Sequence, residues 1–283
     1  FLVNIFLFVC MFCPQQRTGQ LKQPLKVLLG TLVGCNITLQ LCILFCSIIT
    51  IFPVFVSYLF IIQLTYFTMR ISLTSSFWLN VFYFCQIVPA QHSFFMCLKR
   101  NIRFFIYSAL IADKVFFLFG FYAGITCGVI QDELFCKKNL NTYTQFNETQ
   151  TTKIHTMQAV FLVDTWLRCC YLSLCLCVML TSSCVTILYL QKHMKHMEES
   201  SFSSVRFKRQ MRVTITCIIQ TFLSFFCFVW MIVYELLPHY IYLYSYICGT
   251  VACLYSFGTT FNLCVGQTIF RSCVDEMYQK CLK

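Results

Sequence analysis

The chain has 283 residues, of which 59% are hydrophobic and 11% are charged. A soluble domain usually carries about 25% charged residues, so this composition excludes an ordinary soluble domain and indicates a membrane protein. The net charge of +11 does not indicate nucleic acid as a partner, because the cations lie between long apolar runs and not on a polar surface.

Prolines and polar segments divide the apolar sequence into seven runs, which we interpret as membrane helices. The first run is shorter than the roughly 20 residues that a span needs, so we expect it to be the inner end of a helix that starts before this chain. The fold class expected is an all-α membrane protein, a seven-transmembrane helix bundle in a single domain over residues 1–283. The predicted helices cover residues 1–12, 25–51, 54–88, 103–125, 157–190, 207–236 and 240–269. Asn4, Asn36 and Asn262 lie within these apolar runs, and their amides are expected to form hydrogen bonds between helices.

The segments between the helices differ in length and polarity. Residues 126–156 are polar and are the only long loop predicted, whereas the loop that begins at Pro89 is expected to be short and to lie on the membrane surface. The tail at residues 270–283 is predicted to be cytoplasmic. Phe270, Val274, Met277 and Tyr278 have helical spacing within it, which favours an amphipathic helix on the membrane.

The 21 cysteines do not indicate a disulfide scaffold, because most lie inside apolar runs, where Cys behaves as a small hydrophobic residue. Cys127 and Cys136 fall in the loop predicted to be extracellular. A disulfide between them and two free thiols are both compatible with the sequence. Neither a metal site nor a cofactor is expected, since no CxxC pairs at zinc spacing occur.

The distribution of Lys and Arg predicts the orientation. Of the 21 such residues, fifteen fall on one side of the predicted membrane, three fall on the other, and three lie within helices. The positive-inside rule then places the tail in the cytoplasm and the amino-terminal end outside. The sequon that begins at Asn147 agrees, because glycosylation takes place in segments that face outward. Seven spans in this orientation are the arrangement of a G-protein-coupled receptor, at the plasma membrane.

Several motifs add a resemblance to a known family. Residues 79–87 read Leu-Asn-Val-Phe-Tyr-Phe-Cys-Gln-Ile, and residues 94–102 read Phe-Phe-Met-Cys-Leu-Lys-Arg-Asn-Ile. They resemble the inner end of helix three and the following loop of the bitter taste receptors, the taste receptors type 2. Residues 2–6, residues 24–30, the His193/Met197 pair and residues 266–271 resemble further motifs of this family. Gln86 in place of Lys, and Thr259-Thr260 in place of His-Ser, indicate a divergent member.

The resemblance implies a ligand cavity between the outer ends of helices three, five, six and seven. Asp164 and Arg168 are four residues apart on one helix face, so they can form an ion pair. For every residue expected at the cavity, the alternative role is helix packing, a structural ion pair or the aromatic belt at the membrane interface. The expected ligand-binding residues are Thr65, Tyr66, Met69, Asp164, Arg168, Trp230, Tyr234, Glu235, Tyr242 and Tyr246.

At the inner end the resemblance implies contact with a heterotrimeric G protein, with a gustducin-type Gα and βγ. Tyr83 would switch between inactive and G-protein-bound packing, and the cations around it would also meet anionic membrane lipid. The orientation signal by itself is the alternative explanation of these cations. The residues expected at this end are Tyr83, Gln86, Lys99, Arg100, His193, Lys195, Lys208, Arg209 and Arg212.

We therefore predict a receptor of the bitter taste type that binds small organic molecules, with a vomeronasal type 1-like pheromone receptor as the near alternative. A membrane transporter is the rival of another class. It would favour internal repeats and broken helices at mid-membrane, and the sequence has neither. An enzyme is not expected, because no HExxH, GxSxG or paired-carboxylate motif occurs.

Overall fold

The computed structural model describes residues 1–12, 23–49, 55–89, 93–139, 148–197, 204–236, 241–267 and 270. Within these residues the chain forms helices and no strand, so the predicted all-α fold is confirmed there. The helices are α1 (Leu2–Phe12), α2 (Gln23–Ile49), α3 (Phe55–Ile87), α4 (Ser93–Arg100), α5 (Ile102–Asn139), α6 (Glu148–Met197), α7 (Ser204–Leu236) and α8 (Ile241–Gly266).

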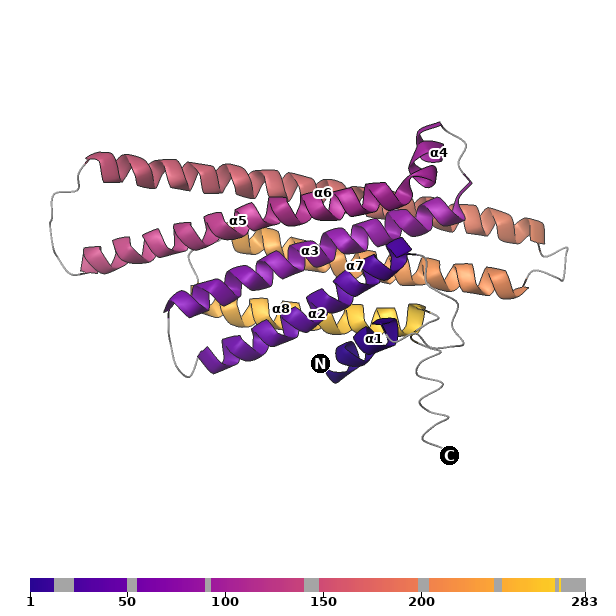
Figure 1. The fold of residues 1–283 in the computed structure, drawn as a ribbon, viewed down its shortest axis with the longest axis horizontal. Coiled ribbons are helices and arrows are strands. Elements are labelled where there is room, and N and C mark those ends of the chain that lie inside the picture. Colours follow the sequence, from indigo (N-terminus) through magenta and orange to yellow (C-terminus); the bar gives the residue numbers. More distant parts are fainter. Residues whose placement is uncertain are drawn as a thin grey trace, which may run out of the picture.

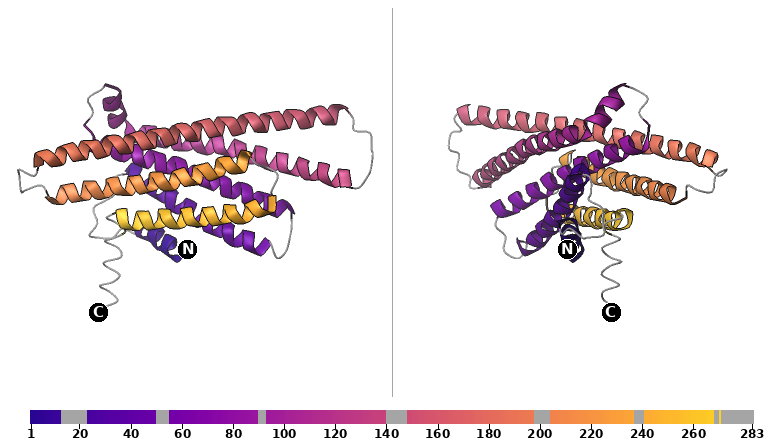
Figure 2. Two further views of the ribbon diagram at one scale, coloured as in Figure 1. Left: turned by 180° about the vertical axis from the view of Figure 1, so that it is seen from behind. Right: turned by 45° about the vertical axis from the view of Figure 1, so that its right-hand side comes forward.

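The long helices run roughly side by side as one bundle (Figure 1). α5 and α6 extend beyond the others at one end, which we call the hairpin end, and α4 lies near the opposite end, which we call the α4 end. Seen from behind, α6, α7 and α8 lie in front of α2 and α3 (Figure 2). α3 contacts α2, α4, α5, α6, α7 and α8, so it is the central element of the bundle.

Among the residues that the structure describes, five helical segments are long and apolar enough to cross a membrane, judged by length and composition. α1 is apolar but has 11 residues, and α3 has 33 residues but carries many hydroxyl side chains and Arg70. A membrane helix bundle is therefore supported, and the number of seven spans stays a prediction. The five segments are Gln23–Ile49, Ile102–Ile130, Ala159–Lys192, Gln210–Val233 and Ile247–Gly266.

Two regions are helical where the sequence predicted loops. α5 continues to Asn139 and α6 begins at Glu148, so most of the loop expected at residues 126–156 is helix. The loop was inferred from polarity, but polar residues do not end a helix, and residues 129–139 and 148–156 contain neither Gly nor Pro. The surface loop contains α4, which ends with Lys99 and Arg100 in its last turn, where cations favour a helix.

The core of the described residues consists of two apolar clusters, and α3 contributes to both. Tyr66 and Met69 belong to the cluster nearer the hairpin end, together with residues of α2, α5, α6, α7 and α8. Leu79 and Phe82 belong to the cluster nearer the α4 end, which also contains residues of α1. α3 therefore joins the two halves of the bundle, together with α2, α5, α7 and α8, which also contribute to both clusters.

Between these clusters α3 carries a run of small polar residues that is interrupted by Leu73: Ser72, Thr74, Ser75 and Ser76. Ser72 Oγ lies 2.9 Å from the hydroxyl of Tyr255 on α8, and Ser76 Oγ accepts a hydrogen bond of 2.9 Å from Gln220 Nε2 on α7. Small hydroxyl side chains allow membrane helices to approach closely and to form hydrogen bonds between them. The run explains how α3 packs so closely against α7 and α8.

A stripe of glycines on α5 has a similar effect. Gly120, Gly124 and Gly128 are spaced four residues apart and therefore share one face of the helix. A Cβ atom at Gly124 would lie 2.5 Å from Gln63 Oε1 of α3, and one at Gly128 would lie 3.2 Å from Leu59 of α3. The absence of side chains along this face lets α5 lie directly against α3.

The contact between α7 and α8 predicts a measurable effect of one methyl group. In Gly266→Ala, the new Cβ would lie 2.2 Å from Oγ1, 2.5 Å from Cγ2 and 2.9 Å from Cβ of Thr216, so no rotation of that side chain removes the clash. We expect a destabilisation of about 1–3 kcal/mol. A lower midpoint of thermal unfolding, followed with a thiol-reactive fluorophore, checks it.

The matched control is Gly249→Ala on the same helix, where nothing lies within 4 Å of the new Cβ. This variant is expected to keep or slightly raise the unfolding midpoint, because alanine is favoured over glycine in a helix. Equal midpoints for the two variants would contradict the close approach of α7 and α8.

Candidate functional site

The residues predicted at the ligand cavity on α3 are buried in the structure. Thr65, Tyr66 and Met69 are 5%, 2% and 0% exposed, and the last two belong to the apolar cluster nearer the hairpin end. The hydroxyl of Thr65 donates a hydrogen bond of 2.8 Å to the carbonyl of Ile61 on its own helix. In this structure the three side chains contribute to the packing of the bundle.

Asp164 and Arg168 on α6 form the ion pair that their spacing predicted. Arg168 Nη1 lies 2.5 Å from Asp164 Oδ2, and the two side chains are only 2% and 5% exposed. Arg168 also donates a hydrogen bond of 3.1 Å to the hydroxyl of Thr165. A Cβ at Gly120 of α5 would meet the Arg168 guanidinium and the Asp164 carboxylate, so the pair lies directly on that glycine. The ion pair is thus enclosed where α5 and α6 meet.

Aromatic side chains near this end converge on one thiol. Tyr66 of α3 and Trp230 of α7 both interact with the sulfur of Cys248 on α8, which is buried. The remaining predicted ligand residues lie on the last turns of α7 and the first turns of α8, and their side chains are outside the described residues: Tyr234, Glu235, Tyr242 and Tyr246.

Toward the α4 end, Asn80 of α3 joins three helices through its amide. Its Nδ2 donates hydrogen bonds of 3.0 Å to Ser183 Oγ on α6 and 3.2 Å to Thr221 Oγ1 on α7. Its Oδ1 accepts a hydrogen bond of 3.2 Å from Ser182 Oγ. Because every member is buried, none of these polar groups has water as an alternative partner. The hub therefore holds α3, α6 and α7 in one relative position.

A second hub lies on α7 and reaches α8. The side chain of Gln220, which already donates to Ser76, accepts a hydrogen bond of 3.1 Å from Asn262 Nδ2. The same nitrogen donates a bond of 2.9 Å to the backbone carbonyl of Thr216. Asn262 was expected to form hydrogen bonds between helices, and this expectation is confirmed.

The predicted switch residue Tyr83 is buried at the α4 end, and its hydroxyl donates a hydrogen bond of 3.0 Å to Gln267 Oε1, just after α8. Gln86, one turn further on, is exposed. A cavity of about 10 Å³ lies beside Asn80 and Tyr83, between α3, α6 and α7. One water molecule needs about 10–15 Å³, so the three helices are closely packed at this point.

The helical segments that carry the predicted basic residues lie at the α4 end. Figure 1 shows α4, the last turns of α6 and the first turns of α7 at this end. Lys99 and Arg100 of α4 are exposed, and Arg212 of α7 is half-buried. The others lie on α6 and α7 with side chains outside the described residues: His193, Lys195, Lys208 and Arg209.

Buried amides also join α1, α2 and α8. Thr260 Oγ1 on α8 donates a hydrogen bond of 2.8 Å to Asn4 Oδ1 and accepts one of 3.3 Å from Asn36 Nδ2. The expectation that Asn4 and Asn36 bond between helices is confirmed. The residue that links them is the Thr260 noted as a departure from the family motif.

Asp113 of α5 is a buried carboxylate with partners on two other helices. It accepts hydrogen bonds of 3.3 Å from Trp78 Nε1 on α3 and 2.5 Å from the hydroxyl of Tyr171 on α6. A charged group within a membrane helix is costly unless the bundle provides partners. Asp113 therefore fixes the positions of α3 and α6 against α5.

The helical backbone of α5 does not fit a disulfide between Cys127 and Cys136. Cys127 is a free thiol, and both residues lie on α5, nine positions apart. Nine residues of helix rise about 13 Å, whereas Cα atoms joined by a disulfide lie within about 7 Å. The glycosylation residue Asn147 and the amphipathic tail after Phe270 lie outside the described residues, so both stay predictions.

A family model described as taste receptor protein (TAS2R) matches residues 1–282, essentially the whole chain. The chain belongs to the taste receptor family. The family resemblance of residues 79–87 and 94–102 is thereby confirmed. No curated protein matches the chain. Taste receptors are a family of receptors and not of enzymes, and membership implies a ligand and a G protein as partners in general.

Sequence reasoning did not identify several residues that organise this taste receptor. Asn80 lies inside the motif around Tyr83, but its partners come from α6 and α7, more than 100 positions away. Gly120 shows its role only through the ion pair that lies on it. The sequence did contain a signal for Gly120, because glycines spaced four residues apart, as Gly120, Gly124 and Gly128 are, form a motif of close helix packing.

The buried ion pair of the taste receptor predicts a non-additive effect. In Asp164→Leu, Arg168 loses its carboxylate in a site that is only 2% exposed, and breaking such a pair costs about 3–5 kcal/mol. In the double variant Asp164→Leu/Arg168→Met both charges are gone, so we expect most of this loss to be recovered. The fraction of receptor at the cell surface and the thermal unfolding midpoint measure both effects. A double variant as unstable as the single one would contradict the pairing.

Proposed function

We propose that this taste receptor is a G-protein-coupled receptor of the bitter taste type, which binds small organic molecules and activates a heterotrimeric G protein with a gustducin-type Gα. The observation that carries the proposal is the match of the family over residues 1–282. The network of buried polar residues between the two ends of the bundle supports a mechanism for it.

The ligand site we propose lies between α3, α6, α7 and α8 near the hairpin end. The set formed by Tyr66, Met69 and Trp230 is aromatic and apolar, and the Asp164–Arg168 pair supplies polar groups on α6. Such a combination suits small amphipathic molecules. Because these side chains are packed against one another here, a ligand must separate them, and it favours the arrangement in which they are apart.

The response at the α4 end would be a separation of α3, α6 and α7. These helices enclose only about 10 Å³ beside Tyr83, so the carboxyl end of Gα has no room while the hydrogen bonds of Asn80 persist. The ligand must prefer the open arrangement, because equal affinity for both would shift nothing. The exposed cations of α4, Lys99 and Arg100, would then contact the G protein.

The proposed orientation in the plasma membrane places the α4 end in the cytoplasm and Asn147 outside, with the amino-terminal end outside and seven spans. The excess of cations at the α4 end supports this orientation. The orientation predicts that an antibody reaches an epitope beside Asn147 on intact cells. Access only after permeabilisation would show that the orientation is the reverse of the one proposed.

A screen for agonists tests the function. Cells that carry the receptor and a gustducin-type Gα chimera are expected to release calcium in response to at least one member of a chemically diverse bitter panel, and cells without the receptor are not.

Once an agonist is found, Trp230→Ala should weaken its potency about tenfold, because the ring lies among the proposed ligand contacts. The matched control is Trp166→Ala on α6, whose ring is 58% exposed on the outside of the bundle and should leave the potency unchanged. No response across the panel at normal surface expression would contradict the proposal.

The hydrogen bond of Tyr83 predicts a change in basal activity. Tyr83→Phe removes the bond to Gln267 without a change of shape, and a net worth of about 0.5–1.5 kcal/mol corresponds to a two- to tenfold shift toward the open arrangement. Basal inositol phosphate accumulation without ligand should rise accordingly. The control Tyr122→Phe changes a ring that is 66% exposed on α5 and should have no effect. Unchanged or lower basal signalling in Tyr83→Phe would show that this bond does not hold the closed form.

A further inference from the structure

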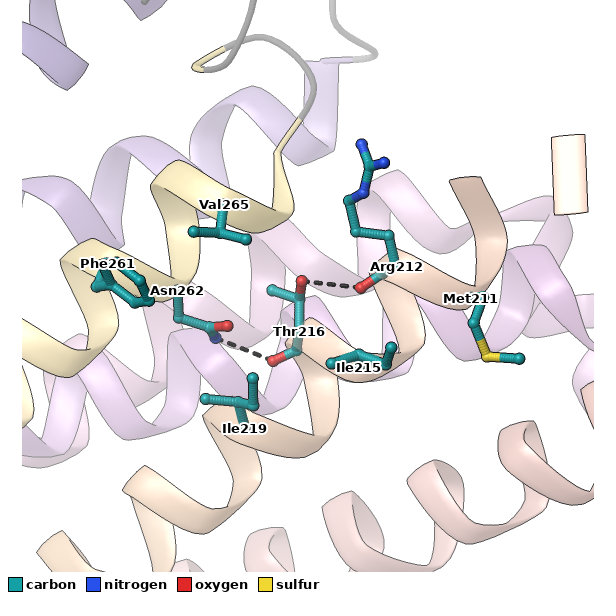
Figure 3. A pocket seen from close by; sticks show the side chains of 8 residues that line it. All are labelled: Met211, Arg212, Ile215, Thr216, Ile219, Phe261, Asn262 and Val265. Atoms are coloured by element: carbon teal, nitrogen blue, oxygen red, sulfur yellow. Dashed lines mark hydrogen bonds between the residues drawn. The ribbon is translucent and has the colours of Figure 1, made fainter. Parts of the chain in front are cut away.

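A cavity of about 540 Å³ opens between α7 and α8 on the outside of the bundle (Figure 3). Its apolar lining includes Ile215 and Ile219 of α7 and Phe261 and Val265 of α8, which are 45–63% exposed. Both helices belong to segments long and apolar enough to cross a membrane, so these exposed side chains face lipid. The cavity is therefore a groove that is open to the bilayer and distinct from the ligand site proposed inside the bundle.

The floor of the groove is polar and lies on the contact between the two helices. Thr216 and Asn262 are buried there, and the amide of Asn262 donates to the carbonyl of Thr216 (Figure 3). Just beyond, Gly266 lies so close to Thr216 that a Cβ would not fit. The groove thus runs along a close contact between α7 and α8.

The α4 end of the groove carries a positive charge. Arg212 lines the groove, and its guanidinium extends away from Ile219 and Phe261 (Figure 3). No hydrogen bond or ion pair joins this guanidinium to any residue that the structure describes. The sequence of α8 contains no carboxylate, and that of α7 has only Glu235 at its opposite end. A cation at the edge of an apolar groove and without a carboxylate from either helix complements an anionic headgroup.

We propose that this groove binds one anionic phospholipid of the cytoplasmic leaflet. An acyl chain lies against the apolar side chains of α7 and α8, and the phosphate lies at Arg212. The volume is within the range of small-molecule sites, about 300–1,000 Å³. Because the lipid touches the Thr216–Asn262 contact, its occupancy is coupled to any change in the packing of α7 against α8. The choice of leaflet rests on the proposed orientation, whereas the lipid preference rests on the groove alone.

Lipid retention by the purified receptor tests the proposal. Full-length receptor is reconstituted with equal amounts of phosphatidylserine and phosphatidylcholine that have identical acyl chains, and the lipids still bound after delipidation are counted by native mass spectrometry. The wild type is expected to keep one phosphatidylserine in preference to phosphatidylcholine. Arg212→Gln should lower this preference about fivefold, the effect of one cation near a membrane surface, and Arg212→Lys should keep most of it.

Two further variants separate the groove from a general positive charge. Arg103→Gln removes an exposed cation at the start of α5, outside the groove, and should leave the preference intact. Ile219→Trp fills the apolar part without a change of charge and should reduce retention of the lipid. Equal retention of the two lipids by the wild type, or equal losses in Arg212→Gln and Arg103→Gln, would overturn the proposal. The measurement needs no agonist and no G protein, so its outcome is independent of the receptor assay.

Discussion

The packing of this receptor depends on one constraint, which is that polar groups buried in a membrane bundle must find partners within the protein. Lipid offers no hydrogen bonds, so an unsatisfied group there costs several kcal/mol. Among the described residues, α3 carries the largest concentration of such groups, all of them buried: Arg70, Ser72, Thr74, Ser75, Ser76 and Asn80. The helices around α3 therefore pack at the positions where they can supply matching hydroxyl and amide groups.

This constraint connects the two ends of the bundle. The apolar cluster near the hairpin end contains Tyr66 and Met69 of the proposed ligand site, and the cluster near the α4 end contains Tyr83. Between them, the bonds of Ser72 to Tyr255 and of Ser76 to Gln220 join α3 to α8 and α7. Hydrogen-bonded and closely packed contacts change between discrete arrangements and do not deform continuously. A helix displacement at the ligand site is therefore passed along the bundle toward the α4 end.

The charges divide the molecule in another way. Inside the bundle, carboxylates are matched: Asp164 with Arg168, and Asp113 with Tyr171 and Trp78. At the α4 end cations predominate, and several of them are exposed. A G protein and anionic lipid would both bind to these cations at this end. The half-buried Arg212 lies between these two environments, on the outer face of α7.

The sequence by itself determined what depends on composition and local spacing: the membrane class, the helical segments, the family, and the Asp164–Arg168 pair, whose members are four residues apart on one helix. It also indicated that Asn4, Asn36 and Asn262 bond between helices, because lone amides in apolar runs need partners. Only the tertiary structure decided which partners these are. The contacts of Asn80 with Ser183 and Thr221, of Tyr83 with Gln267 and of Gly266 with Thr216, and the groove at Arg212, depend on how far each helix is shifted and rotated against its neighbours. That relative position follows from the packing of all the helices together, and no single stretch of sequence contains it.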